Sequence, residues 1–484
     1  MLRSRSARGS PSRALAGCSR PALRARSARG SPSRALAGCS RPALRARSAR
    51  SIRGVRGGRL AARHVARSEQ VRGGRPAVSK QLAVRWPVIG AAERQAALGV
   101  LDSGILNGPS APQVKGLEKE FAAFLGARFC LATNSGTAAL HMALAAGGIG
   151  AGDEVITTAF SYVATPLAIL YQSAVPVFVD IDQETFNIDP SLIEERITPR
   201  TRALLPVHIH GLPCDMDEIN SIARRRGLLV IEDAAQAHGA SYRGRPAGTL
   251  GAMAGFSLNA TKNLPCGEGG LFVTNNETFL PVARRIRLHG IDAEEVPFDP
   301  THPLDEEGEE KVTGMGWMYM PQELPAAIAR AQLRRLVEFN ENAAANAALL
   351  TSRLSGLPGV IPPSCPPDRT HIYHKYRVRL DPEAMGFSMP AAEMRDTVLT
   401  ALRAEGVEAT LWGAKPLPEL ELFRGLGHAR GCAPRTSELL DCSLVVGSQS
   451  YPLFPQPRAL MEQYADAFEK VVTNIAKRVD AVQR

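Results

Sequence analysis

The chain has 484 residues, of which 44% are hydrophobic and 22% charged, a composition typical of a soluble globular protein with more than one domain. Its formal charge of +11 is unevenly distributed, because residues 1–80 carry +20 and the remaining 404 residues therefore carry −9. The charge thus gives no support to nucleic-acid binding by the rest of the chain, and nucleic acid is an unlikely partner. No apolar run approaches the roughly 20 residues of a membrane span, which argues against a membrane partner.

Residues 1–80 are rich in arginine and contain a verbatim repeat. The string RSARGSPSRALAGCSRPALRA starts at Arg5 and again at Arg26, a period of 21 residues. Three origins remain open: upstream sequence translated through a misassigned start, a targeting segment, or a basic binding tail. In each case we expect disorder, because the segment has too little apolar surface to offset the entropy of ordering.

The eight cysteines are scattered along the chain and form no CxxC pair. This pattern argues against a zinc site or a redox dithiol. We therefore expect no metal, and a reduced, cytoplasmic protein.

Short strand-like runs alternate with helical stretches between about residues 95 and 280. The pattern predicts an α/β domain over residues 81–335, with a mostly parallel sheet covered on both faces and ligands at the carboxyl ends of its strands. The predicted strands are EVITT (154–158), VPVFVDI (175–181), ALLPVH (203–208), LLVIED (228–233), AGFSL (254–258) and GLFVTN (270–275).

The C-terminal part has a different pattern. A long helical run from Glu323 to about Leu354 follows the acid-rich stretch 292–311 and ends near the proline-rich LPGVIPPSCPPD. A strand at HKYRVRL, a helix at AAEMRDTVLTALRAEG and a last helix from about Pro457 then predict a small α+β domain. We assign the linking helix and this small domain to residues 336–484.

Three polar motifs follow predicted strands. NSGTAAL (134–140) opens a helix, so the N–H groups near Gly136, Thr137 and Ala138 could face an anion, although such a start is as often a plain cap. VIEDAAQAHG ends a strand with Glu232 and Asp233, of which at most one need be structural.

The third motif is NATKNLPCGEGG, which places Lys262 in a loop after a strand. A partly desolvated lysine has a lowered pKa and can form an imine with a carbonyl. Together with Asp233, Ser257 and a helix start that could bind phosphate, it is what a protein supplies to pyridoxal phosphate (PLP). Tyr162, in TTAFSYVAT, could stack on the ring. His210, His289 and His374 could lie near a substrate, although a lone histidine is more often a structural or surface residue.

These motifs together resemble a known family. NSGTAAL, GDEVITTAFSYVAT, PVFVDID, PVHIHGLPCDMDEI, VIEDAAQAHGA, FSLNATKN with GEGGLFVTN, and RLHG are similar in order and spacing to the DegT/DnrJ/EryC1/StrS aminotransferases, from about Leu82 to the C-terminus. The resemblance implies the PLP-dependent transferase fold type I, which is aspartate-aminotransferase-like, and a homodimer with shared active sites. It also implies amino transfer from glutamate or glutamine to a keto sugar, usually nucleotide-linked, or a cyclitol.

The resemblance further implies roles for single residues. Lys262 would hold the cofactor and move the proton, and Asp233 would pair with the pyridine nitrogen beside Gln236. Tyr162 would stack on the ring. The phosphate would lie among Gly136, Thr137, Ala138 and Ser257.

One stretch departs from the family pattern. Met318 and Met320 stand where relatives carry an Asn or Arg that reaches the partner subunit's cofactor phosphate or substrate, and a thioether donates no hydrogen bond. This departure leaves open a non-catalytic regulatory member as one alternative to an aminotransferase. A PLP-dependent dehydratase or aromatic-forming relative is the other alternative.

Overall fold

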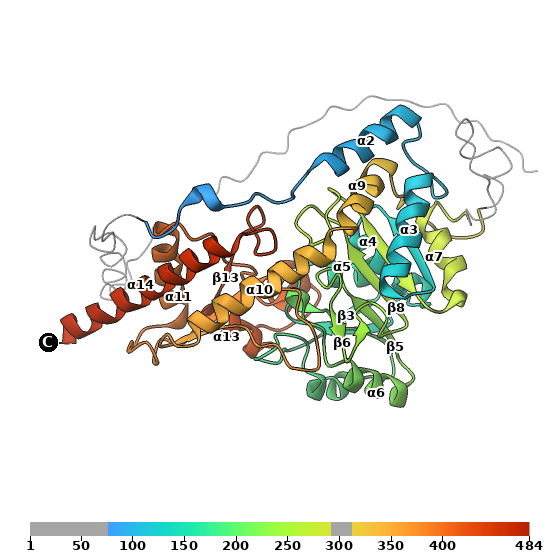
Figure 1. Ribbon diagram of the computed structural model, residues 1–484. Coiled ribbons are helices and arrows are strands. Elements are labelled where there is room, and N and C mark those ends of the chain that lie inside the picture. The colour runs from blue at the N-terminus through green and yellow to red at the C-terminus, as the bar shows by residue number, and fades with distance from the viewer. Residues whose placement is uncertain (1–75, 292–311, 484) are drawn as a thin grey trace, which may run out of the picture. The chain divides into compact units, whose positions relative to one another are not determined.

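The structure is a computed structural model that describes residues 76–291 and 312–483 (Figure 1). Residues 1–75, for which we predicted disorder, and the acid-rich stretch 292–311 lie outside the described residues. Residues 76–79 belong to the described part of the chain. Val78 is buried in a hydrophobic cluster with residues such as Val398 and Leu402, and its N–H donates to the Glu405 carbonyl oxygen at 3.1 Å.

The central element is a seven-stranded sheet with the order β1-β9-β8-β5-β4-β2-β3. Only β9 runs opposite to the other strands of this sheet, so the prediction of a mostly parallel sheet is confirmed. The strands are β1 (Phe129–Thr133), β2 (Glu154–Thr158), β3 (Val175–Val179), β4 (Thr201–Leu205), β5 (Leu229–Asp233), β8 (Met253–Ser257) and β9 (Gly270–Thr274).

Helices cover both faces of this sheet (Figure 1). Alternation along β1 sends Leu131 into the core under α4 (Gly136–Ala146) and Cys130 into the core under α3 (Pro112–Leu125). The helix α4 approaches the sheet closely, because a Cβ on Gly255 of β8 would lie 2.8 Å from the Leu140 side chain. The remaining helices of this part are α2 (Ala91–Ser103), α5 (Ala164–Tyr171), α6 (Met216–Arg226), α7 (Leu280–Arg287) and α9 (Glu323–Leu333).

Two predicted helices differ from the structure. The run 323–354 forms two helices, α9 and α10 (Leu336–Leu354), separated at residues 334–335. The stretch PSLIEERI forms two short 3-10 turns, Pro190–Leu192 and Glu194–Arg196, instead of a helix. Its eight residues include an N1 proline and two β-branched isoleucines, and they are too few for a stable helix without packing.

The second sheet is antiparallel and has the order β10-β11-β13-β12. Its strands are β10 (Val360–Ile361), β11 (Tyr376–Leu380), β12 (Ala409–Thr410) and β13 (Ser443–Val446), and its helices are α11 (Ala391–Ala404), α12 (Glu421–Gly425), α13 (Pro434–Cys442) and α14 (Arg458–Gln483). The helices α10 and α14 pack side by side on it (Figure 1). Both sheets lie within the residue ranges predicted for the two domains.

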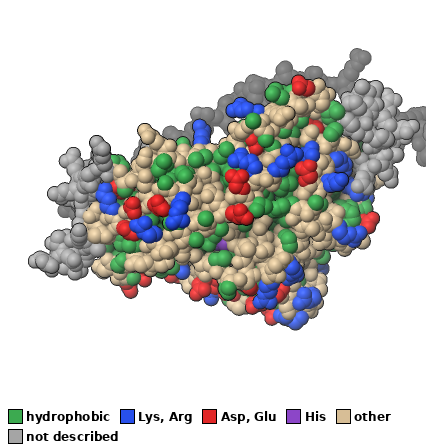
Figure 2. Space-filling model, viewed as in Figure 1, with side chains coloured by type: hydrophobic (Ala, Val, Ile, Leu, Met, Phe, Trp, Pro, Cys, Tyr) green, Lys and Arg blue, Asp and Glu red, His purple; other side chains and the backbone are tan. Residues whose placement is uncertain are grey.

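The visible surface carries Lys and Arg side chains interspersed with Asp and Glu (Figure 2). Within the described ranges, no helix combines the length and the hydropathy needed to cross a bilayer.

Candidate active site

A cavity of about 440 Å³, open to solvent, lies at the carboxyl ends of β5 and β8. Seven of the eight residues predicted from the sequence line it: Gly136, Thr137, Tyr162, Asp233, Gln236, Ser257 and Lys262. The predicted strand-end site is therefore assembled in one place, from segments that are up to about 130 residues apart in the chain.

Ala138 is the predicted residue that does not line the cavity. Its N–H donates to the Oγ of Ser135, the N-cap of α4, at 3.1 Å, and so is not available to a ligand. Gly136 and Thr137 come before it, at helix positions whose N–H groups have no partner within the helix, and both border the cavity. The role of Gly136, Thr137 and Ala138 in binding a phosphate stays a prediction, and the geometry favours the first two.

Glycines let this helix start approach the strands beside it. A Cβ on Gly136 would lie 2.6 Å from the Cβ of Ser257, and a Cβ on Gly270 of β9 would overlap the carbonyl oxygen of Ser135. Any larger residue at either position would push the α4 N-terminus away from the Ser257 hydroxyl.

Asp233 is buried at the end of β5, with both carboxylate oxygens hydrogen-bonded. Its Oδ2 accepts from the Thr165 hydroxyl at 2.7 Å, and its Oδ1 accepts from the Ala235 N–H at 3.1 Å. Burial raises the pKa of Asp233 above its usual value, against the lowering effects of these hydrogen bonds and of Lys262. Sequence reasoning missed Thr165, although it lies three residues after the predicted Tyr162.

The adjacent Glu232 has a structural role. Its carboxylate accepts from His208 Nε2 at 2.8 Å and from the N–H groups of Gly248, Leu250 and Gly251 at 2.7, 2.7 and 2.6 Å. It therefore fixes the turn before β8, on the side of the strand away from Asp233. Of the two acids, Asp233 faces the cavity.

Lys262 lies in the loop between β8 and β9, and the loop's hydrogen bonds fix its backbone. Its N–H donates to the Asn259 carbonyl oxygen at 2.9 Å, and its own carbonyl accepts from Trp86 Nε1 at 3.2 Å. Burial lowers the pKa of the Lys262 amine to about 8, while Asp233 and Glu268 act in the opposite direction. The amine is thus poised closer to its neutral, nucleophilic form than an exposed lysine.

Gln236 and Tyr162 lie at opposite depths of the cavity. Gln236 is buried, and its Oε1 accepts from the His210 N–H at 2.8 Å, so it fixes the loop after β4. Tyr162 is 63% exposed at the rim, where its ring is free to cover a ligand.

The C-terminal part also contributes to the cavity. His374, Lys375, Trp412 and Gln449 line it. Of the three histidines named from the sequence, His374 lines the cavity, whereas His210 and His289 do not. The Nδ1 of His374 lies 3.0 Å from Asn263 Oδ1, which ties it to the Lys262 loop. The four lining residues lie more than 100 positions after Lys262, and no local pattern links them to it.

Met318 and Met320 do not line the cavity in the described chain. The Met318 carbonyl accepts from Asn134 Nδ2 at 3.0 Å, and its side chain is 50% exposed. Their position opposite a partner subunit's site stays a prediction.

The donor set of the cavity suits PLP. A helix start beside the Ser257 hydroxyl suits a phosphate, a buried carboxylate at Asp233 suits a protonated ring nitrogen, and the Lys262 amine suits an aldehyde. The residues present therefore fit the cofactor.

Comparisons with known proteins agree with this geometry. SpsC of Bacillus subtilis (strain 168), a spore coat polysaccharide biosynthesis protein, is 39% identical to the chain over 321 residues, which cover 66% of this chain and 79% of SpsC. DesV of S. venezuelae matches with a TM-score of 0.69 and 34% identity, over 78% of this chain and 93% of DesV. DesI, crystallised in the presence of its TDP-sugar product, matches with a TM-score of 0.71 and 28% identity, over 86% of this chain and 99% of DesI.

The model of one protein family matches residues 87–450, and its description names aminotransferases. The match and the similar structures confirm the predicted PLP-dependent transferase fold and the predicted enzyme class. The chain belongs to the DegT/DnrJ/EryC1/StrS aminotransferase family.

Proposed function

We propose that the protein transfers an amino group, by means of PLP, from glutamate or glutamine to a keto sugar linked to a nucleotide. The observation that carries the proposal is the placement of Lys262 and Asp233 in one cavity, where an amine of lowered pKa and a buried carboxylate both line the wall. Family membership supports PLP as the cofactor.

When bound, PLP supplies an aldehyde that condenses with amines and a ring that accepts electrons. The protein's residues do the rest. Asp233 would keep a proton on the ring nitrogen, with its carboxylate held in place by two hydrogen bonds. Lys262 would hold the cofactor through its amine and would carry a proton to and from the substrate carbon. Gly136, Thr137 and Ser257 would orient the phosphate, and Tyr162 would cover the ring.

The acceptor is inferred from the relatives. SpsC is named for polysaccharide biosynthesis, and DesI was crystallised with a TDP-sugar product. A keto sugar is also consistent with a wide cavity lined by hydroxyl and amide groups as well as charged ones. We further propose a homodimer in which Met318 and Met320 approach the partner's cavity.

The test is cofactor attachment followed by turnover. Protein mixed with PLP should gain a visible absorbance band that borohydride removes, and mass spectrometry should find the cofactor on the Lys262 peptide. Lys262→Ala should lose both signals and all amino transfer. Lys119→Ala, a change at an exposed lysine on α3, should keep them. Transfer activity retained in Lys262→Ala would refute the proposal.

Product analysis separates the remaining alternatives. An aminotransferase consumes glutamate or glutamine in step with aminated sugar, whereas a dehydratase or aromatic-forming enzyme forms its product without a donor. A non-catalytic regulatory member would fail to convert the cofactor with any amino donor.

A further inference from the structure

Lys375 is a buried cation that borders the active-site cavity. Lys375 lies immediately before β11 and is 8% exposed. It lines the cavity together with Lys262. Within the described ranges, its ammonium group has no hydrogen bond and no ion pair. An ammonium group removed from water without a partner is costly, so this position calls for a counter-ion.

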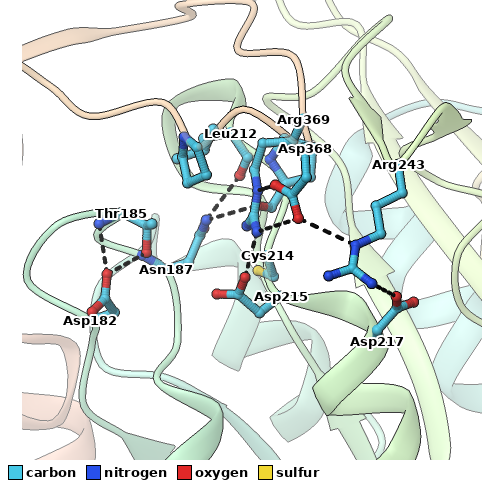
Figure 3. A network of polar contacts seen from close by, with 12 residues as sticks. Asp182, Thr185, Asn187, Leu212, Cys214, Asp215, Asp217, Arg243, Asp368 and Arg369 are labelled. Atoms are coloured by element: carbon cyan, nitrogen blue, oxygen red, sulfur yellow. Dashed lines mark hydrogen bonds and ion pairs between the residues drawn. The ribbon is translucent and has the colours of Figure 1, made fainter.

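Ion pairs and hydrogen bonds attach the segment that carries Lys375 to the loop between β4 and α6 of the large-sheet part. Arg369, which is buried, pairs with Asp215 at 2.5 Å and with Asp368 at 2.7 Å and donates to the Pro213 carbonyl oxygen at 2.9 Å. Figure 3 shows Arg369 enclosed by these groups, with Arg243 bridging Asp368 to Asp217. The ionic anchor holds the start of the segment in one place.

Backbone hydrogen bonds continue this attachment up to the lysine. The Ile372 N–H donates to the Gly211 carbonyl oxygen at 3.2 Å, and the Lys375 N–H donates to the His210 carbonyl oxygen at 3.4 Å. Lys375 is therefore preorganised at the cavity by contacts that do not involve its own charge.

The charged groups near Lys375 increase the need for an anion. The pKa of Lys375 is lowered to about 8, first by burial and then by the charges of Lys262 and Arg377. The side chain of Arg377 donates to His210 Nε2 at 3.1 Å and to the Ser443 hydroxyl at 2.7 Å. Both acceptors are uncharged, so these contacts leave the positive charge of Arg377 uncompensated.

The acids of the cavity already have partners. Asp233 is bonded to Thr165 and Ala235, and Glu268 accepts from Asn259 Nδ2 at 2.7 Å. Lys375 also borders a second, narrow hollow with Glu184 and His371, but Glu184 is exposed and does not pair with it. The part of the cavity formed by Lys375 thus carries an uncompensated positive charge.

The position of this charge distinguishes between possible anions. The cofactor phosphate has a separate cradle at the α4 start and Ser257. The carbons beside the ketone of a sugar carry hydroxyl groups, and nucleotide phosphates lie several atoms away from it. An amino acid, by contrast, carries a carboxylate directly on its reacting carbon, so a cation in the same cavity as Lys262 can reach it.

We propose that Lys375 binds a carboxylate of the amino-acid donor and so determines the enzyme's specificity for that donor. The inference rests on the proposed function, because it takes the donor to be a dicarboxylic amino acid or its amide. Loss of the charge removes one charge-assisted hydrogen bond, which corresponds to a loss of affinity of about 10- to 100-fold.

Calorimetry on the PLP-loaded protein tests the proposal with glutarate, a dicarboxylate that has no amino group and cannot react. Lys375→Met should weaken glutarate binding at least about tenfold, and Lys375→Arg should restore most of it. Glutaramide, the uncharged analogue, should bind wild type and variant alike. Unchanged far-ultraviolet circular dichroism and PLP absorbance would show that the variant is folded.

Kinetics supply a second readout. Lys375→Met should raise KM for glutamate in the donor half-reaction and leave KM for the keto acceptor unchanged. The proposal is overturned if Lys375→Met binds glutarate as wild type does, or if only the acceptor half-reaction is impaired. If wild-type protein fails to convert the cofactor with any donor, the proposed function fails; a glutarate affinity that depends on Lys375 would still support the anion site.

Discussion

The two adjacent acids at the end of β5 should respond in opposite ways to loss of charge. Glu232→Gln should destabilise the fold and spare the chemistry, because its carboxylate accepts four hydrogen bonds from buried groups. Asp233→Asn should spare the fold, because burial already disfavours the charged form of Asp233, as its raised pKa shows. The same change should abolish the chemistry, because asparagine has no charge with which to keep a proton on the ring nitrogen.

The magnitude for Glu232→Gln follows from the contacts. Glutamine keeps one acceptor oxygen, but its NH₂ group faces N–H donors in place of the second oxygen, which accepts from Leu250 and Gly251. Hydrogen bonds to a charged group are worth roughly 1.5–3 kcal/mol each, and two are lost. The free energy of unfolding should therefore fall by about 3–6 kcal/mol.

Urea unfolding of the cofactor-free proteins measures this change, and PLP absorbance with a glutamate half-reaction measures the chemistry. We expect a lower unfolding midpoint for Glu232→Gln with the absorbance band retained. For Asp233→Asn we expect an unfolding midpoint no lower than wild type, with the half-reaction lost. Equal unfolding midpoints for Glu232→Gln and wild type would refute the structural assignment of Glu232.

Three further predictions concern the cavity. Gly270→Ala should lower the free energy of unfolding in urea by about 1–3 kcal/mol, because the new Cβ overlaps the Ser135 carbonyl oxygen. The change should also weaken PLP retention in equilibrium dialysis. PLP retention equal to wild type would contradict the close packing. Thr165→Val removes a hydrogen bond that lowers the pKa of Asp233, so the acid limb of the pH–activity profile should move to higher pH; an unchanged profile would show that Asp233 does not govern it. In cofactor-free protein, the rate at which an amine-reactive reagent labels Lys262 should reach half its maximum near pH 8, because only the neutral amine reacts. The labelling rate of exposed lysines should still be increasing at that pH, because their usual pKa is about 10.4. A half-maximum for Lys262 near that higher value would refute the role of burial.

The sequence alone was sufficient for the main architecture and for the location of the site. Strand and helix periodicities depend on which faces of a local segment are buried, so a parallel sheet could be predicted from runs of five to seven residues. Because the carboxyl ends of parallel strands meet at one edge, motifs at Asp233 and Lys262 could be expected to lie in one cavity, as they do.

The tertiary structure decided what depends on contacts between distant segments. Strand alternation could not say which of Glu232 and Asp233 faces the cavity; the turn at 248–251 decided it by supplying three N–H donors to Glu232. Lys375 follows Lys262 by 113 residues, and only the anchoring of its segment to the large sheet brings the two amines to one cavity. Local patterns follow from the burial of neighbouring residues, whereas the partners of a buried charge are set by how separate segments pack.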